Sequence, residues 1–326
     1  MSGLILAGLC SLALTFFSGF VFIPVLKKIK AGQPILKYVK EHEQKSGTPT
    51  MGGLFFILPL TAVFFVFGGG RTRIATVSVA IGLFYMLVGF LDDFLKIKLK
   101  HNEGLKPYQK IVFQTAIALL GGAFAYTNGL TVLYIPFVKK TIDIGVWVIF
   151  VAAAVFIALT NSVNLTDGLD GLCGGVSACY LLIVAVLILL EKNFAASYLK
   201  STEYEGLDLL ISVTFFAVIG FLIFNEPKAK VFMGDTGSLG LGGILGAVSV
   251  FSGNTLFIPL IGAAFVWSSL SVVIQVAHFK RTRKRVFLMA PFHHHLQMKG
   301  FTETQIDFYY SLVTVIIGLV AIILYL

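Results

Sequence analysis

The chain has 326 residues, of which 57% are hydrophobic and only 13% are charged, and its mean hydropathy is +0.91. A soluble domain is about half apolar and about one quarter charged, so this composition argues against a soluble protein and indicates an integral membrane protein. The formal net charge is +9. In a membrane protein, basic residues in the loops mainly determine which side of the membrane each loop occupies, so this charge does not indicate nucleic acid binding.

A helix needs about 20 apolar residues to cross the hydrocarbon core of a bilayer. Apolar segments of roughly this length predict an all-α fold of about ten transmembrane helices, in a single polytopic domain over residues 1–326. No basic residue precedes the first segment, so we interpret it as a retained transmembrane helix rather than a secretory signal. The predicted spans are 3–25, 52–69, 74–91, 111–127, 145–160, 172–190, 207–224, 238–252, 256–278 and 305–326.

The basic residues are distributed unevenly over the predicted loops. Of the 25 lysines and arginines, 19 follow odd-numbered spans and 6 follow even-numbered ones. Cytoplasmic loops carry the excess of basic residues, so the pattern predicts that both termini lie outside and the odd-following loops inside.

The unusual polar segments all fall on that same predicted cytoplasmic face. Five segments far apart in sequence would therefore meet at one surface, which is typical of an enzyme that works at the membrane boundary. A transporter would more often place polar groups near the midplane, in broken helices. The segments are 45–53, 92–96, 161–171, 225–238 and 290–297.

Two pairs of aspartates stand beside apolar runs. Asp92 and Asp93 end the third predicted span, where carboxylates are costly unless they are paired, hydrated or bound to metal. Adjacent helical residues face different sides, so we expect one to contact a metal or substrate and the other to orient a lysine. Asp167 and Asp170 are predicted to open the sixth helix on one face of its first turn, where ordinary capping is the competing interpretation.

Asp235 lies between glycines in "VFMGDTGSLGLGG", before a predicted helix. Glycines allow backbone N–H groups to approach an anion, and a helix N-terminus favours phosphate. Asp235 can supply an oxygen ligand to Mg²⁺, which is usually bound by one or two carboxylates together with substrate phosphates. Close packing of glycine-rich helices is the alternative explanation.

Three consecutive histidines occur in "MAPFHHHLQMKG", and three cysteines lie in or beside apolar runs. Three adjacent imidazoles cannot easily point at one ion and no cysteine is near, so we expect hydrogen bonds to substrate or a proton-transfer role rather than a zinc site. Cys10, Cys173 and Cys179 are interpreted as packing residues without a disulfide.

Together, "GTPTMGG", "GFLDDFLK", "NSVNLTDGLDGL", "NEPKAKVFMGDTGSLGLGG" and "MAPFHHH" resemble the phospho-N-acetylmuramoyl-pentapeptide transferase family of the polyprenyl-phosphate N-acetylhexosamine-1-phosphate transferase superfamily. The motifs occur in that family's order across most of the chain. The resemblance implies a homodimeric, multi-pass enzyme of the bacterial plasma membrane. It implies transfer of phospho-MurNAc-pentapeptide from UDP-MurNAc-pentapeptide to undecaprenyl phosphate with Mg²⁺, which gives lipid I and UMP in peptidoglycan synthesis.

The resemblance also implies roles for individual residues. Asp92, Asp93, Asp235 and His294 would be catalytic, and Asp235 would be the metal ligand. The residues that would bind substrate or line the cleft are Lys45, Thr50, Asn164, Asp167, Asp170, Asn225, Phe232, Gln275, His293 and His295.

The chain departs from the family pattern at three positions, with Ser268 and Gln297 where glutamate is common and Phe301 where tryptophan is common. A missing carboxylate at 268 can alter helix pairing or substrate contacts.

Alternatives remain open at this stage. For the chemistry, they are direct attack by the lipid phosphate, with or without a base such as Asp92, and a phospho-enzyme intermediate on an aspartate. For the function, they are a sister GlcNAc-1-phosphate transferase, a transporter and a non-catalytic lipid-binding protein. The unbroken histidine triplet argues against the first of these.

Overall fold

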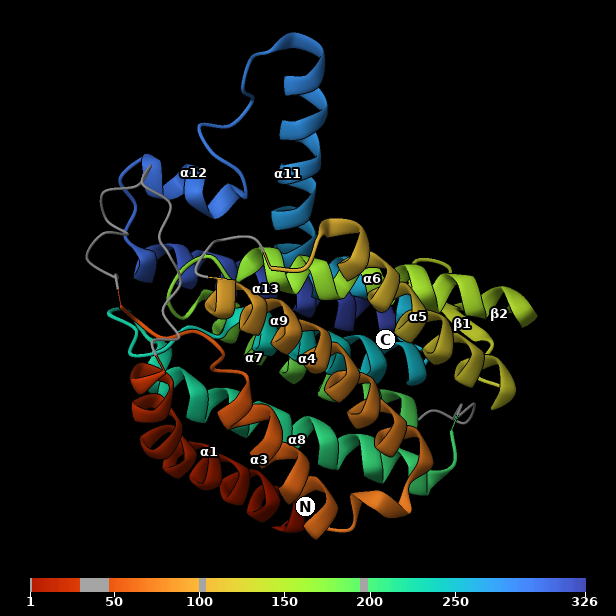
Figure 1. Ribbon diagram of the computed structural model, residues 1–326. Coiled ribbons are helices and arrows are strands. Elements are labelled where there is room, and N and C mark those ends of the chain that lie inside the picture. The colour runs from red at the N-terminus through yellow and green to blue at the C-terminus, as the bar shows by residue number, and fades with distance from the viewer. Residues whose placement is uncertain (1, 30–46, 100–103, 194–198) are drawn as a thin grey trace.

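The computed structural model describes residues 2–29, 47–99, 104–193 and 199–326. Over these residues the fold is almost entirely helical, as predicted, and eight segments are long and apolar enough to cross a membrane. Figure 1 shows most of them side by side in one bundle. They are α1 (Ser2–Lys28), α4 (Arg73–Leu99), α5 (Pro107–Thr127), α6 (Val148–Thr166, with the 3-10 turn Gly145–Trp147 before it), α7 (Leu172–Asn193), α8 (Ser201–Asn225), α11 (Ala263–Thr282) and α13 (Glu303–Tyr325).

The other helices are shorter or more enclosed. The predicted span 52–69 contains α3 (Leu54–Val66), whose 13 residues extend over about 20 Å, less than the thickness of the hydrocarbon core. The predicted span 256–278 is interrupted, because a 3-10 turn (Thr255–Phe257) and the short α10 (Ile258–Ile261) precede α11. The remaining helices are α9 (Gly234–Phe251), α12 (Phe292–Met298) and the 3-10 turn Gly69–Arg71.

Two predicted helix ends are wrong, and both errors place aspartates incorrectly. α4 continues to Leu99, so Asp92 and Asp93 lie inside the helix rather than at its end. α6 continues through Asn161 and Asn164 to Thr166, and α7 begins only at Leu172. Asp167 and Asp170 therefore lie in the connecting loop and do not form the first turn of a helix.

α9 is the central helix of the bundle. All its residues from Thr236 to Phe251 are buried, and it packs against α4 and α6. Glycine permits this close approach: a Cβ at Gly242 would lie 2.8 Å from Cα of Thr160 on α6, and one at Gly89 on α4 would lie 2.7 Å from the backbone N of Thr236. Small residues at such interfaces let helix backbones approach in a membrane.

A short antiparallel hairpin is the one described departure from a helical fold. β1 (Val132–Ile135) pairs with β2 (Lys140–Asp143), and Val132 lies opposite Asp143. The prediction of an all-α fold omitted it. The alternation of β-branched and aromatic residues in this loop is typical of strands, but the loop is short compared with the apolar runs around it.

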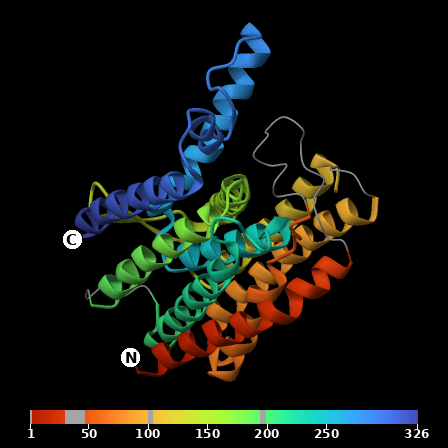
Figure 2. The same ribbon diagram turned by 90° about the vertical axis from the view of Figure 1, so that its left-hand side faces the viewer.

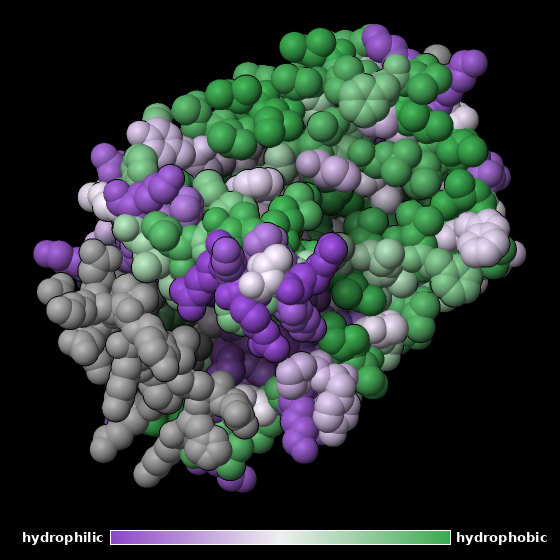
Figure 3. Space-filling model, turned by 90° about the horizontal axis from the view of Figure 1, so that it is seen from above, coloured by the Kyte–Doolittle hydropathy of each residue, from purple (hydrophilic) through white to green (hydrophobic). Residues whose placement is uncertain are grey.

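The two ends of the bundle differ. Figure 2 shows both chain termini at one end, whereas the polar segments 47–53, 92–96, 226–236 and 167–171 meet at the other through contacts described below. α11 and α12 project away from the bundle as an arm (Figures 1 and 2). Seen from above (Figure 3), hydrophilic side chains gather in one area of the surface and apolar side chains cover most of the rest. An apolar exterior is expected of a bundle surrounded by lipid.

Candidate active site

Asp93 fixes the position at which α9 begins. Its fully buried carboxylate accepts hydrogen bonds from the backbone N of Thr236 at 2.9 Å, from the Thr236 hydroxyl at 2.7 Å and from the backbone N of Asp235 at 3.3 Å. The first N–H groups of a helix have no partner within the helix, so an acceptor from another helix can cap them. Asp93 on α4 thus caps α9 and holds Asp235 in the first turn of that helix.

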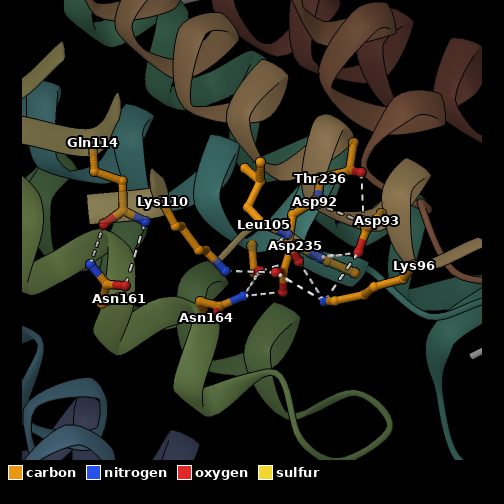
Figure 4. Close-up of polar contacts among 12 residues, drawn as sticks. Asp92, Asp93, Lys96, Leu105, Lys110, Gln114, Asn161, Asn164, Asp235 and Thr236 are labelled. Carbon is orange, nitrogen blue, oxygen red and sulfur yellow. Dashed lines mark hydrogen bonds and ion pairs between the residues drawn. The ribbon is translucent and has the colours of Figure 1, made fainter. Parts of the chain in front are cut away.

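Asp235 is surrounded by donors from three other helices (Figure 4). Its Oδ2 accepts from Lys110 Nζ of α5 at 2.6 Å and from Lys96 Nζ of α4 at 3.2 Å, and its Oδ1 accepts from Asn164 Nδ2 of α6 at 2.7 Å. Burial alone would raise the pKa of Asp235, but the ammonium group of Lys110 and then that of Lys96 hold it well below its usual value. The carboxylate is therefore ionised at neutral pH.

Asp92 completes the acid cluster, which we define as Asp92, Asp93 and Asp235. Its Oδ2 lies 2.6 Å from Lys96 Nζ, and its Oδ1 accepts from the backbone N of Leu105 at 2.9 Å. Asp92 pairs with Lys96, and Asp93 caps α9. The expected contact of one of these two aspartates with a metal or substrate stays a prediction. One oxygen from each of the three carboxylates lies within 4.8 Å of the others.

The acid cluster fits a divalent metal ion. Carboxylate oxygens are the ligands that Mg²⁺ prefers, and here three carboxylates converge from two helices. A cation already lies among them, because Lys96 Nζ is 2.6 Å from Asp92, 3.2 Å from Asp235 and 3.8 Å from Asp93. The lysine ammonium group shows that the three carboxylates can surround a positive charge.

The loop between α6 and α7 lies beside this cluster. Asp167 contacts the backbone of Gly234, and burial, followed by the nearby charges of Asp235 and Asp93, raises its pKa well above the usual value. Gly234 itself adopts φ +70°, and a Cβ there would lie 2.6 Å from Asp93 Oδ2. The close approach of α9 to Asp93 thus depends on glycine at this position.

Asp170 and Asn225 hold the neighbouring loops together. Asp170 accepts at Oδ2 from the backbone N of Ala229 at 3.0 Å. Asn225 accepts from the backbone N of Gly171 at 3.1 Å and donates to the carbonyl of Val231 at 2.9 Å. In this structure these two side chains, which are predicted to bind substrate or line the cleft, connect the loops beside the acid cluster.

The segment 47–53 pairs with the start of α9 through its backbone. Phe232 donates to the carbonyl of Pro49 and accepts from Gly52. The Thr50 hydroxyl and Asp93 Oδ2 both lie beside Gly234, so this segment reaches the acid cluster. The Thr50 hydroxyl is buried and has no hydrogen-bond partner among the described residues. Lys45, predicted to bind substrate or line the cleft, lies outside the described residues.

The three histidines form part of a helix, α12, rather than a loop, and they point in different directions. His293 is fully buried against Gly168 of the α6–α7 loop, and its ring nitrogens have no hydrogen-bond partner in the described part of the chain. Burial, and then His294, lower the pKa of His293 well below its usual value. His294 pairs with Gln297 at 3.1 Å, and His295 accepts from the backbone N of Leu288.

Gln275 of α11 forms hydrogen bonds within the arm. Its Oε1 accepts from the backbone N of Val286 at 2.9 Å and of Phe287 at 3.0 Å, and its Nε2 donates to the carbonyl of Phe287. It thus connects α11 to the segment that precedes α12. The departure at Ser268 is accommodated without a carboxylate, since the buried Ser268 hydroxyl donates to the carbonyl of Ala264.

The structure therefore brings together the five predicted segments, with Lys45 outside the described part. It also adds Lys96, Lys110 and Thr236, for which no role at the site was predicted individually. Lys96 had a local signal, because it follows Asp92 by four residues and so lies on the same helix face. Lys110 had none, since its partner is 125 residues away.

Two family models match parts of the chain. The family model described as glycosyl transferase family 4 matches residues 75–253. The phospho-N-acetylmuramoyl-pentapeptide-transferase signature 1 matches residues 45–57.

Relatives are similar over nearly the whole chain. A phospho-N-acetylmuramoyl-pentapeptide-transferase of Clostridioides difficile (strain 630) is 42% identical over 94% of this chain and 92% of its own length. One of Clostridium novyi (strain NT) is 38% identical over 98% and 96%, and one of Thermoanaerobacter sp. (strain X514) is 38% identical over 96% of each. This chain therefore belongs to the phospho-N-acetylmuramoyl-pentapeptide-transferase family, within glycosyl transferase family 4.

Proposed function

We propose that the protein transfers phospho-MurNAc-pentapeptide from UDP-MurNAc-pentapeptide to undecaprenyl phosphate, releasing UMP and forming lipid I for peptidoglycan synthesis. Family membership supplies the substrates. The observation that carries the chemistry is the acid cluster with Lys96 and Lys110 at one end of the bundle. Transfer between two phosphates brings several negative charges together, and such a site can offset their repulsion.

The position of each residue at the site suggests its role in the reaction. Asp235, with Asp92 and Asp93 beside it, would hold Mg²⁺, which when bound withdraws charge from the pyrophosphate. Lys110 would neutralise phosphate oxygens, and Asp93 keeps Asp235 in place through its bonds to Thr236. Asn164 orients Asp235 from the opposite side. His294, which is partly exposed beside Gly168, would contact the substrate, and the fully buried His293 next to it would support its position.

Direct attack by the lipid phosphate fits these contacts better than a phospho-enzyme intermediate. Asp92 is paired with Lys96 and with the backbone N of Leu105, and Asp93 is engaged by the first turn of α9. With Lys96 in place neither carboxylate presents an uncommitted oxygen as a nucleophile, and a bound metal ion would engage the same oxygens. The phosphate monoester has a second pKa near 6, so it is largely ionised at neutral pH and needs no strong base.

We further propose that the protein is a single polytopic domain of the bacterial plasma membrane, with both termini outside, the acid cluster on the cytoplasmic face, and a homodimeric state. The bias of basic residues supports this orientation. The nucleotide substrate would enter from the cytoplasm while the polyprenyl chain stays in the lipid.

The test is UMP release by purified protein in detergent, with undecaprenyl phosphate and Mg²⁺. UDP-MurNAc-pentapeptide and UDP-GlcNAc are offered separately, and a parallel sample contains EDTA. We expect turnover of the first substrate alone, and none with EDTA. Turnover of UDP-GlcNAc alone would support the proposed phosphate chemistry but show that the sugar substrate is GlcNAc rather than MurNAc-pentapeptide. If folded protein releases no UMP from either substrate, the proposed activity is wrong.

A further inference from the structure

Lys96 already occupies the centre of the acid cluster as a cation. Its Nζ lies 2.6 Å from Asp92 Oδ2, 3.2 Å from Asp235 Oδ2 and 3.8 Å from Asp93 Oδ1 (Figure 4). Lys96 thus reaches all three carboxylates that would hold the metal ion. The other lysine at the cluster, Lys110, reaches Asp235 from α5 on the far side, at 2.6 Å.

The ammonium group and a metal ion cannot share these oxygens. Mg²⁺ requires carboxylate oxygens at about 2.0–2.1 Å in near-octahedral order. An ion at that distance from Asp92 and Asp235 would lie within a few ångströms of Lys96 Nζ, where two positive charges repel each other strongly in a partly buried site. One of the two cations has to leave.

We propose that Lys96 and the divalent metal ion are alternative occupants of the acid cluster, so that metal binding requires displacement of the Lys96 ammonium group. The proposal rests on the metal-binding role given to this cluster under the proposed function. Lys96 compensates the buried carboxylates in the metal-free protein, which avoids the large cost of leaving buried charges unpaired.

The geometry favours Lys96 over Lys110 as the side chain that moves. Lys96 lies on the same helix as Asp92 and Asp93 and reaches all three carboxylates, whereas Lys110, which is equally exposed, has its ion pair with Asp235. A metal ion among the three carboxylates therefore competes most directly with Lys96, whose long, flexible side chain can rotate away. Lys110 pairs with Asp235 Oδ2, while Asn164 donates to the other oxygen of the same carboxylate. It can stay in place and continue to neutralise Asp235. The displaced Lys96 ammonium group is then free to bind a substrate phosphate.

The test measures metal binding rather than turnover. Mn²⁺ is titrated into purified protein in detergent, and free Mn²⁺ is followed by electron paramagnetic resonance. Lys96→Met removes the competing charge. Lys98→Met removes an exposed charge two residues along the same helix and is the matched control. We expect Lys96→Met to bind Mn²⁺ at least about tenfold more tightly than the wild-type protein, and Lys98→Met to stay within about twofold because an exposed charge is screened.

The outcomes separate this inference from the proposed function. Unchanged or weaker Mn²⁺ binding by Lys96→Met, with wild-type binding that is lost in Asp235→Asn, would overturn the exchange and leave the metal site standing. No saturable binding in any of the proteins would overturn both. If Lys96→Met fails to fold, Lys96→Gln replaces it as a polar neutral variant, and the rise in unfolding temperature caused by Mn²⁺ provides a second measure of affinity.

Discussion

The acid cluster and the histidines of α12 lie at the same end of the molecule but are held in place in different ways. The cluster is built on the interior of the bundle: Asp93 caps the buried α9, and Lys110 and Asn164 reach Asp235 from two further helices. The histidines lie on a seven-residue helix of the projecting arm, which is connected to α11 through Gln275 and through the hydrogen bond from the backbone N of Phe292 to Ser271.

We infer that the two regions have different roles: the acid cluster positions the charges that meet the phosphates, and the arm controls how the substrate reaches them. Charges that must meet phosphates are fixed by packed helices, which hold a site more rigidly than loops do. The histidines contact the same site through Gly168 but are attached to a peripheral element. We therefore expect changes at the cluster to affect fold and chemistry together, and changes in the connection between α11 and α12 to affect substrate binding with little effect on the fold.

Removing the charge of Asp235 should have the largest effect on activity. Asp235→Asn keeps the shape and the bond from Asn164 but takes away the charge that faces Lys96 and Lys110. We expect turnover to fall by about a thousandfold, measured as UMP release. Glu205→Gln removes an exposed acid of α8 and should leave turnover unchanged. More than a tenth of wild-type activity in Asp235→Asn would contradict the role of this carboxylate.

Separating α4 from α9 should damage fold and chemistry together. Gly89→Ala places a methyl group against the backbone of Asp235 and Thr236, so the two helices have to move apart. Overpacking of this kind costs about 1–3 kcal/mol, and it would also shift Asp235 from Lys96. We expect a lower unfolding temperature together with a loss of turnover. Gly3→Ala is the control, since a Cβ at Gly3 would have no neighbour within 4 Å.

The sequence predicts the existence of the helices well, because long apolar runs are unambiguous. It misplaces the ends of α4 and α6, since Asp93 and Asn164 are polar residues that continue a helix and find their partners on other helices. The hydrogen bond from Thr236 to Asp93 joins residues 143 apart, and no local pattern contains it. Family motifs identify Asp92, Asp93 and Asp235, but the contact of Lys110 with Asp235 follows only from the packing of α5.

The burial of His293 should make stability depend on pH. Its folded-state pKa lies below the value of about 6.5 in an unfolded chain, so the unfolded state binds the proton more readily. The free energy of unfolding should fall as pH drops below about 6.5, by at most about 1.4 kcal/mol per pH unit. Unfolding temperatures between pH 7.5 and 5.5 would show this loss in the wild-type protein and a smaller one in His293→Asn. Equal losses in both would mean that His293 is protonated in the folded protein.

The smallest effect is expected from Gln275, and it tests the comparison most directly. Gln275→Met keeps an unbranched side chain of similar length and removes the three hydrogen bonds to Val286 and Phe287. If the arm controls access alone, KM for the nucleotide substrate should rise by about threefold, the equivalent of one weak hydrogen bond, with kcat and unfolding temperature nearly unchanged. Lys280→Met, an exposed change on the same helix, should alter none of these. An unfolding temperature that falls as far as that of Gly89→Ala would mean that the arm is part of the packed core, and the distinction between the two regions would be lost.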